Sequence, residues 1–184
     1  MFGKDLDQEI IGLYDSNLLN LFSINEISKR LGKKYPYINK KVTSLIEKGI
    51  LKKIVVGRSH LCSLNLENER TILLLALNEI NKQTNDTKVI KDFIKKHNLD
   101  LTIHSVVKFQ DKSIFILNNL RDRRKIERFF ENAIALDKTE FIDMLIEDSS
   151  LFSEHTVVYG YERFFELITF AREELKKVYS PIAY

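Results

Sequence analysis

The chain has 184 residues, of which 44% are hydrophobic and 30% charged, so it can form one medium-sized or two small domains and is not of the disordered class. Its single cysteine, Cys62, excludes an intrachain disulfide framework, as is typical of proteins in a reducing cytoplasm. No apolar run approaches the roughly 18 residues that span a bilayer, and residues 1–5 lack the apolar core of a signal peptide. We therefore expect a cytoplasmic protein without membrane contact.

Positive charge is concentrated in one segment, residues 27–62, although the net charge of the chain is only +3. This segment holds ten Lys or Arg residues and a single acid, Glu47, so it carries a charge of +9 and the rest of the chain −6. A purely solvated face normally mixes both signs. The exclusion of acids therefore indicates an anionic partner for this segment alone.

Two helices are predicted in the first 32 residues. Apolar residues recur at helical spacing between Asp5 and Asp15, which favours a first helix. Ser23 and Glu26 stand three residues apart just before an apolar run, the pattern of a capping box that begins a second helix. Gly32 is expected to end that helix, because a left-handed residue is favoured there.

A third helix is predicted from Tyr35 to Lys48. Pro36 suits its first turn, where an N–H would have no intrahelical partner, and Gly49 ends it. Its expected buried stripe consists of Ile38, Val42, Leu45 and Ile46. The other side carries cations, hydroxyl groups and an aromatic ring, which suit contacts with phosphates and base edges.

A β-hairpin is predicted next, with strands over residues 50–56 and 60–65 and a tight turn at Gly57-Arg58-Ser59. The order helix, helix, short turn, helix, hairpin is that of a winged helix-turn-helix domain, which we place in residues 1–80 with a connecting helix. Segments Ser23–Gly32 and Tyr37–Leu51 resemble the helix-turn-helix core of MarR-type and archaeal winged-helix regulators, over about a third of the chain.

The resemblance implies that the third helix lies in the major groove of DNA and that Arg58, at the wing, touches the minor groove or the backbone. Four lysines are the candidate phosphate ligands: Lys33, Lys34, Lys40 and Lys41. Four further side chains are the candidates for base contacts: Tyr37, Asn39, Thr43 and Ser44. Tyr35 and Lys53 complete the candidate set. The expected function is sequence-specific regulation of transcription on double-stranded DNA.

The rest of the chain predicts alternating helices and short strands, so the fold class is α+β. A long helix over residues 67–82 and a linker over residues 81–86 lead into a small α/β domain, residues 86–184. Its helices are expected at 87–97, with Val89, Ile90, Phe93 and Ile94 inward, and at 121–132, 139–146 and 161–178. Its strands are expected at 101–109, 113–117, 133–136 and 156–159. The last helix is long and rich in apolar residues, which predicts either a core element or a pairing surface for a second copy.

Residues 137–164, with Asp137-Lys-Thr-Glu-Phe141 and Thr156-Val-Val-Tyr-Gly160, resemble the end of small nucleotidyltransferase-fold domains. Active members carry a Gly-Ser motif and an Asp-x-Asp pair that hold a triphosphate and metal ions. Here Asp111 could overlay the first carboxylate, but Ser113 stands at the second position. Because two carboxylates are needed to hold magnesium against a triphosphate, the resemblance implies a non-catalytic version.

No other pattern predicts catalysis, and we expect no enzyme activity, no metal and no cofactor. The four histidines are dispersed, and Cys62 is expected to face the core of the hairpin. A second basic cluster, Arg121-Asp-Arg-Arg-Lys125, fits a solvated helix start or a nucleic-acid contact. We expect a homodimer on DNA, with residues 86–184 supplying dimerisation or receiving an effector or partner protein. The alternatives are a winged helix that docks protein or RNA, and a nucleotidyltransferase fused to a DNA-binding domain.

Overall fold

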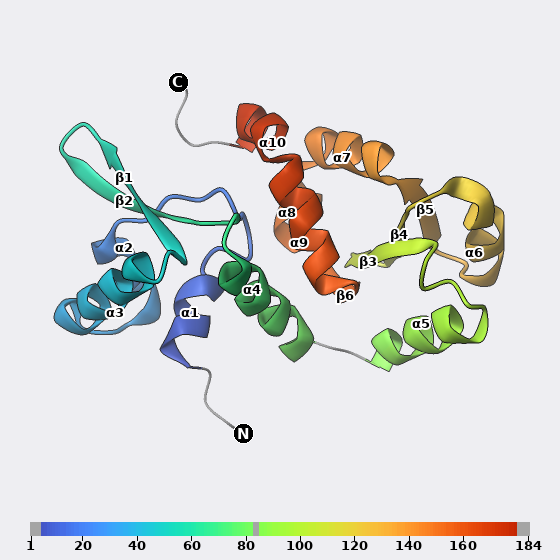
Figure 1. The fold of residues 1–184 in the computed structure, drawn as a ribbon, viewed down its shortest axis with the longest axis horizontal. Coiled ribbons are helices and arrows are strands. Elements are labelled where there is room, and N and C mark those ends of the chain that lie inside the picture. Colours follow the sequence, from blue (N-terminus) through green and yellow to red (C-terminus); the bar gives the residue numbers. More distant parts are fainter. Residues whose placement is uncertain (1–4, 83–84, 180–184) are drawn as a thin grey trace. The chain divides into compact units, whose positions relative to one another are not determined.

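The computed structural model describes residues 5–82 and 85–179 and has an α+β fold (Figure 1). Its contacts define two compact units, which we describe separately. The first unit comprises residues 5–78 and 173–179 of the described chain, and the second comprises residues 79–172. Among the described residues, no helix is long and apolar enough to cross a membrane.

Helices and one hairpin build the first unit. Its elements are α1 (Leu6–Gly12), α2 (Ile24–Leu31), α3 (Tyr35–Glu47), β1 (Leu51–Val56), β2 (Ser59–Leu64), most of α4 (Glu69–Asn81) and most of α10 (Arg172–Tyr179). The three helices and the hairpin that the sequence predicts before residue 66 are therefore confirmed as elements, in the predicted order. The first helix is shorter than predicted, because turns replace it after Gly12.

The capping signals fix the ends of α2. Ser23 Oγ accepts the backbone N–H of Glu26, and the Glu26 carboxylate accepts the backbone N–H of Ser23 at 2.7 Å, so the predicted capping box is confirmed. Gly32 ends the helix with φ +61°, a left-handed conformation that costs a side-chain-bearing residue about 1–2 kcal/mol. The chain consequently turns within three residues into α3.

The core of the first unit collects apolar side chains from every helix of the three-helix segment. Ile38, Val42 and Leu45 of α3 are fully buried, as predicted, whereas Ile46 is only partly buried. Phe22, which precedes α2, forms an isolated antiparallel bridge with Cys62 of β2. The hairpin is thereby tied to the helices by backbone hydrogen bonds as well as by packing.

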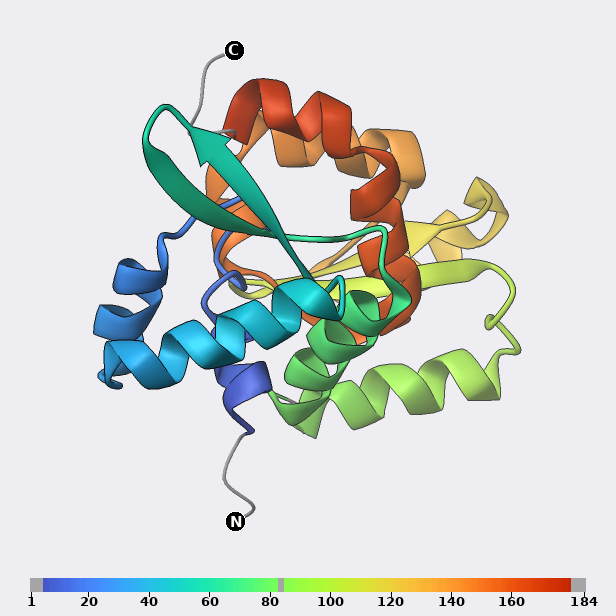
Figure 2. The same ribbon diagram turned by 60° about the vertical axis from the view of Figure 1, so that its left-hand side comes forward.

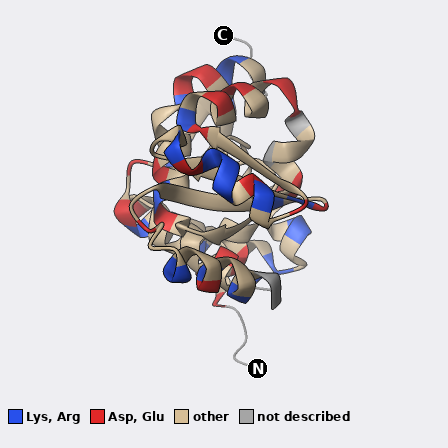
Figure 3. Cartoon of the chain, turned by 90° about the vertical axis from the view of Figure 1, so that its right-hand side faces the viewer, with Lys and Arg blue, Asp and Glu red and all other residues tan. Residues whose placement is uncertain are grey.

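The second unit is a four-stranded sheet with helices on both faces (Figures 1 and 2). Its elements are α5 (Asn85–Lys96), β3 (Ile103–Phe109), β4 (Lys112–Leu117), the 3-10 helix η1 (Leu120–Asp122), α6 (Arg123–Phe129), β5 (Ala133–Asp137), α7 (Lys138–Glu147), α8 (Ser149–Glu154), β6 (Thr156–Tyr159) and α9 (Tyr161–Phe170). The strand order is β5-β4-β3-β6, in which only the β4–β5 pair is parallel. Figure 3 views this unit from the end formed by α6.

Alternation along β4 divides the core of the second unit between the two faces of the sheet. Phe115 and Leu117 pack with Phe93 and Ile94 of α5. Ile116, which lies between them, points to the opposite face, which α7 and α9 contact. Because helices cover both faces, β3 and β4 are almost continuously buried.

The buried carboxylate of Glu79 stabilises the edge of this sheet. Its Oε2 accepts the backbone N–H of Val157 in β6 at 2.7 Å, and its Oε1 pairs with Lys82 Nζ at 2.6 Å. A buried carboxylate needs such partners, because burying an unpaired carboxylate or an unpaired backbone amide destabilises the fold by several kcal/mol. Hydrophobic patterning contains no sign of this contact, because the two partners lie far apart in the chain.

Several sequence expectations are corrected in the second unit. Val89 is 55% exposed rather than inward, because it lies on the outer side of α5, whereas Ile90, Phe93 and Ile94 are buried as predicted. The helix expected at 121–132 is divided into η1 and the shorter α6. Helix α8 was not predicted. The expected linker, residues 81–86, overlaps the first turn of α5, and its residues 83–84 lie outside the described chain.

The predicted long terminal helix is interrupted at Ala171, whose φ of −81° and ψ of 3° depart from helical geometry and separate α9 from α10. Most of the apolar side chains of α9 are buried, so the core alternative accounts for them. Phe170 is the exception, with 91% of its surface exposed.

Gly160 allows β6 to turn directly into α9. Its φ is +67°, and a Cβ at this position would lie 2.4 Å from the carbonyl oxygen of His104 and 3.0 Å from Cα of Ser105. Both atoms belong to the backbone of the central strand β3 and cannot move aside. The close approach of two backbone segments therefore depends on the absence of a side chain.

We predict that Gly160→Ala destabilises the protein by at least about 1 kcal/mol more than Gly32→Ala does. Gly32 is the matched control, because its φ is +61° but no atom would lie within 4 Å of a Cβ at that position. Gly32→Ala should cost only the left-handed penalty of about 1–2 kcal/mol. Denaturant unfolding followed by circular dichroism measures both, and equal losses would contradict the close approach.

Candidate nucleic-acid interface

Helix α3 presents three different sides besides its buried one. At 3.6 residues per turn, Tyr35, Asn39 and Thr43 follow one another along the side next to the hairpin. Lys40 lies opposite the buried stripe and is exposed. Lys41 lies on the side next to α1. The candidate residues thus do not form the single face that the sequence suggested.

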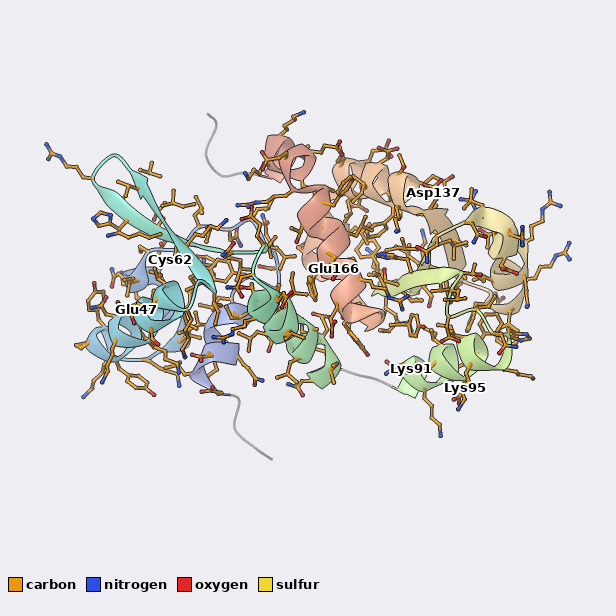
Figure 4. All side chains as sticks on the ribbon, viewed as in Figure 1. Glu47, Cys62, Lys91, Lys95, Asp137 and Glu166 are labelled. Carbon is orange, nitrogen blue, oxygen red and sulfur yellow. The ribbon has the colours of Figure 1, made fainter. Side chains whose placement is uncertain are left out.

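A hollow of about 500 Å³ lies between α3, the start of α2 and the hairpin. Tyr35, Asn39 and Thr43 form its α3 wall, and Lys53 belongs to its hairpin wall. Of the predicted DNA-binding residues, these four are brought together here. Ile46 and Glu47, near the end of α3, complete its wall of the hollow. Figure 4 labels Glu47 on α3 and Cys62 on β2.

Sequence reasoning missed the other polar residues of this hollow. Ser23 and Asn25 come from the start of α2, and His60 comes from β2. Three segments that are distant in the chain meet here, and only the Ser23 capping signal could have pointed to one of them. Each side chain offers hydrogen-bond donors or acceptors, so the hollow can recognise polar groups on a partner.

Two of the predicted phosphate ligands are engaged within the protein. Lys41 Nζ lies 2.8 Å from Asp7 Oδ1, and Lys33 Nζ lies 3.0 Å from Glu9 Oε2. The hydrogen bond that Lys41 donates to the Asp7 carboxylate raises the pKa of Lys41. Both lysines hold α1 against α3 and the turn that precedes it. The structure thus distinguishes Lys41, which is paired with Asp7, from Lys40, which forms no ion pair with any described residue.

Four predicted cations form no ion pair with any described residue: Lys34, Lys40, Lys53 and Arg58. All four are exposed. Lys34 is the N-cap of α3, and Arg58 is in the two-residue turn that joins Val56 and Ser59 of the hairpin. Free cations therefore stand at the start of α3, along it, and on the hairpin.

The two remaining candidates differ in accessibility. Tyr37 is well exposed, whereas Ser44 is partly buried. Tyr37 can therefore meet a partner without rearrangement of the helix. Ser44 offers a smaller accessible surface, and its backbone oxygen accepts from Lys48 at the end of α3.

Cys62 faces the interior, as predicted, and is 2% exposed. Burial raises the pKa of its thiol, so the thiolate is disfavoured, and its backbone oxygen accepts the hydroxyl of Tyr14 at 2.9 Å. In the second unit, burial and the nearby charges of Lys138 and Arg163 lower the pKa of His104 to about 4. Cys62 and His104 are thus structural parts of their cores.

No cluster of three or more histidine, cysteine, aspartate or glutamate residues suited to a metal ion occurs within residues 5–82 and 85–179. Asp111, which the nucleotidyltransferase resemblance placed at a metal ligand, is exposed in the turn between β3 and β4. Comparisons with protein-family models, with curated proteins and with solved structures find no match for this chain.

The capping box gives a pH-dependent prediction. Hydrogen bonds from the Ser23 backbone and side chain lower the folded-state pKa of Glu26, so its stabilising contribution is complete above the ordinary pKa of a glutamate and is lost as pH falls through the lowered value. We predict that Glu26→Gln lowers stability at pH 7 by about 0.5 kcal/mol. Denaturant unfolding should show this difference vanishing at acidic pH, below the lowered pKa; a constant difference would contradict it.

Proposed function

We propose that the chain is a sequence-specific regulator of transcription that binds double-stranded DNA through a winged helix-turn-helix domain formed by the first unit. In this proposal α2 and α3 are the helix-turn-helix, α3 lies in the major groove, and the β1–β2 hairpin is the wing. The element order, the bridge between Phe22 and Cys62 and the short turn at Gly32 support this arrangement.

The observation that carries the proposal is the placement of the unpaired cations. Lys34 at the start of α3, Lys40 on its outer side, and Lys53 and Arg58 on the hairpin belong to the two elements that supply hydrogen-bonding side chains to the hollow, and the segment that holds them contains one acid. Cations fix a protein on the phosphate backbone, whereas amides and hydroxyls read base edges. A duplex needs both sets on one surface.

Within that wall, Asn39 and Glu47 are the side chains best suited to sequence readout. An asparagine can form a bidentate pair with adenine, and a carboxylate can accept the amino group of cytosine. Both residues line the same hollow. Glu47 would repel phosphates, so its place on this otherwise basic surface fits contact with a base rather than with the backbone.

We further propose that the protein acts as a homodimer, without catalytic activity, and that its second unit receives an effector or a partner protein. A dimer would present two copies of α3 to half-sites about 34–36 Å apart. The exposed side chains of Leu73 and Leu77, one turn apart on α4, support a contact between copies.

Lys41 is ion-paired and the adjacent Lys40 is not, so the two lysines should respond differently to substitution in a test of DNA binding. Lys40→Ala should weaken binding to duplexes of any sequence and reduce the slope of log affinity against log salt by about one, since one phosphate contact is lost. Lys41→Ala should change the slope less, because its ammonium group is held by Asp7. Fluorescence anisotropy over a salt series measures both slopes.

The wild-type chain is compared with the two variants on the same labelled duplex, and circular dichroism checks that each variant is folded. Equal salt slopes for Lys40→Ala and the wild type would show that the outer side of α3 is not part of the interface. A preference for structured RNA over duplex, or no nucleic-acid binding at all, would favour the docking alternative.

A further inference from the structure

A second row of cations lies on η1 and α6 of the second unit. On α6, Arg128 follows Arg124 by four residues and Lys125 by three, which places these three cations on one side of the helix, and Arg121 precedes them in η1. All four are exposed, and Ile126 on the opposite side is fully buried. Figure 3 shows this end of the unit with lysine and arginine ribbon segments facing the viewer.

The acids of the same segment accept hydrogen bonds from other residues of the second unit. Asp122 Oδ2 accepts the hydroxyl of Thr102 at 3.3 Å, and Glu127 Oε1 accepts the backbone N–H of Ala135 at 3.2 Å. Arg123 is the arginine that pairs with an acid, Glu140 of α7. The four cations of the row form no ion pair with any residue that the structure describes, so their charges remain available to a partner.

An exposed aromatic ring adjoins this row. Phe129 is 54% exposed, and its ring centroid lies 4.3 Å from that of Phe93 and 4.9 Å from that of Phe130. The ring of His97 lies 6.1 Å away. The ring of Phe129 is therefore held in place by other rings while about half of its surface remains accessible to a partner.

Helix α5, whose Phe93 contacts the ring of Phe129, carries further cations. Lys95 and Lys96 occupy its last turn, next to His97, and both are exposed. Lys91 differs, since its ammonium group lies 5.6 Å from the ring centroid of Tyr161. Figure 4 labels Lys91 and Lys95 on α5. Cations thus occur on both helices, α5 and α6, whose aromatic rings meet at Phe129.

We propose that this face of the second unit, formed by Arg121, Arg124, Lys125, Arg128 and Phe129, binds single-stranded nucleic acid. The cations contact successive phosphates, and an unpaired base stacks on the ring of Phe129. A duplex hides the faces of its bases, so an exposed ring among cations has no role in contacts with a duplex backbone. The face is separate from α3 and the hairpin, and the proposal does not depend on duplex recognition by the first unit.

The test uses the full chain and a labelled, unstructured DNA strand of about 20 nucleotides and mixed sequence, long enough to cover a typical single-strand site. Phe129→Ala should weaken binding to this strand by about tenfold, the order expected for one stacked base. The matched control is Phe170→Ala, which removes an equally large and even more exposed ring from the same unit and should leave the affinity unchanged. Thermal unfolding by circular dichroism checks that both variants keep the fold.

The triple variant Arg124→Ala/Lys125→Ala/Arg128→Ala should reduce the salt slope on the single strand by about two, since each contact with a single strand contributes about 0.7. All measurements are repeated in a Lys40→Ala/Arg58→Ala chain, so that these cations of the first unit do not contribute. Neither variant of the second unit should change the salt slope on duplex DNA.

Two results would overturn the inference. Equal single-strand affinities for Phe129→Ala and Phe170→Ala would show that no base stacks on this ring. An equal loss of duplex and single-strand binding in the triple variant would show that the face holds duplex backbone. Failure of Lys40→Ala to alter duplex binding would instead contradict the function proposed for the first unit, which is a separate claim.

Discussion

Burial of one side of α3 is the constraint on which the candidate interface depends. Ile38, Val42 and Leu45 are fully buried, and burial of each such side chain stabilises the fold by roughly 1.5–3 kcal/mol. Rotating the helix by a single residue would expose this row and bury polar side chains in its place, among them Thr43 in one direction or Lys41 in the other. The core therefore fixes which side chains of α3 point outward, and the hairpin next to it determines which of them share a hollow.

Electrostatics then divides the cations of the first unit into two groups. Lys33 and Lys41 are paired with acids of α1 and help to hold the helices together. Lys34, Lys40, Lys53 and Arg58 are exposed and unpaired among the described residues, and they retain the charge that a phosphate backbone would neutralise. The same residue type thus stabilises the fold where an acid lies within reach and keeps an unpaired charge at the surface where none does.

Local signals explain what could be predicted from the sequence, and contacts between distant residues explain what could not. Ser23, Glu26, Gly32 and Pro36 marked helix ends through interactions within four residues, and apolar spacing identified the buried stripe of α3. By contrast, the pairing of Lys41 with Asp7 and the meeting of Asn25 with His60 at one hollow depend on tertiary structure. The interruption at Ala171 has no glycine or proline to mark it. Val89 fits an apolar pattern, but the pattern is one residue wider than the buried side of α5.

The most direct test of the central claim is selection of genomic DNA fragments by the purified full chain at about 150 mM salt, where non-specific contacts are weak. Sequence-specific recognition by α3 predicts enrichment of a short motif, present as two inverted half-sites about one helical turn apart. Uniform, salt-sensitive recovery of fragments without any shared motif would contradict it.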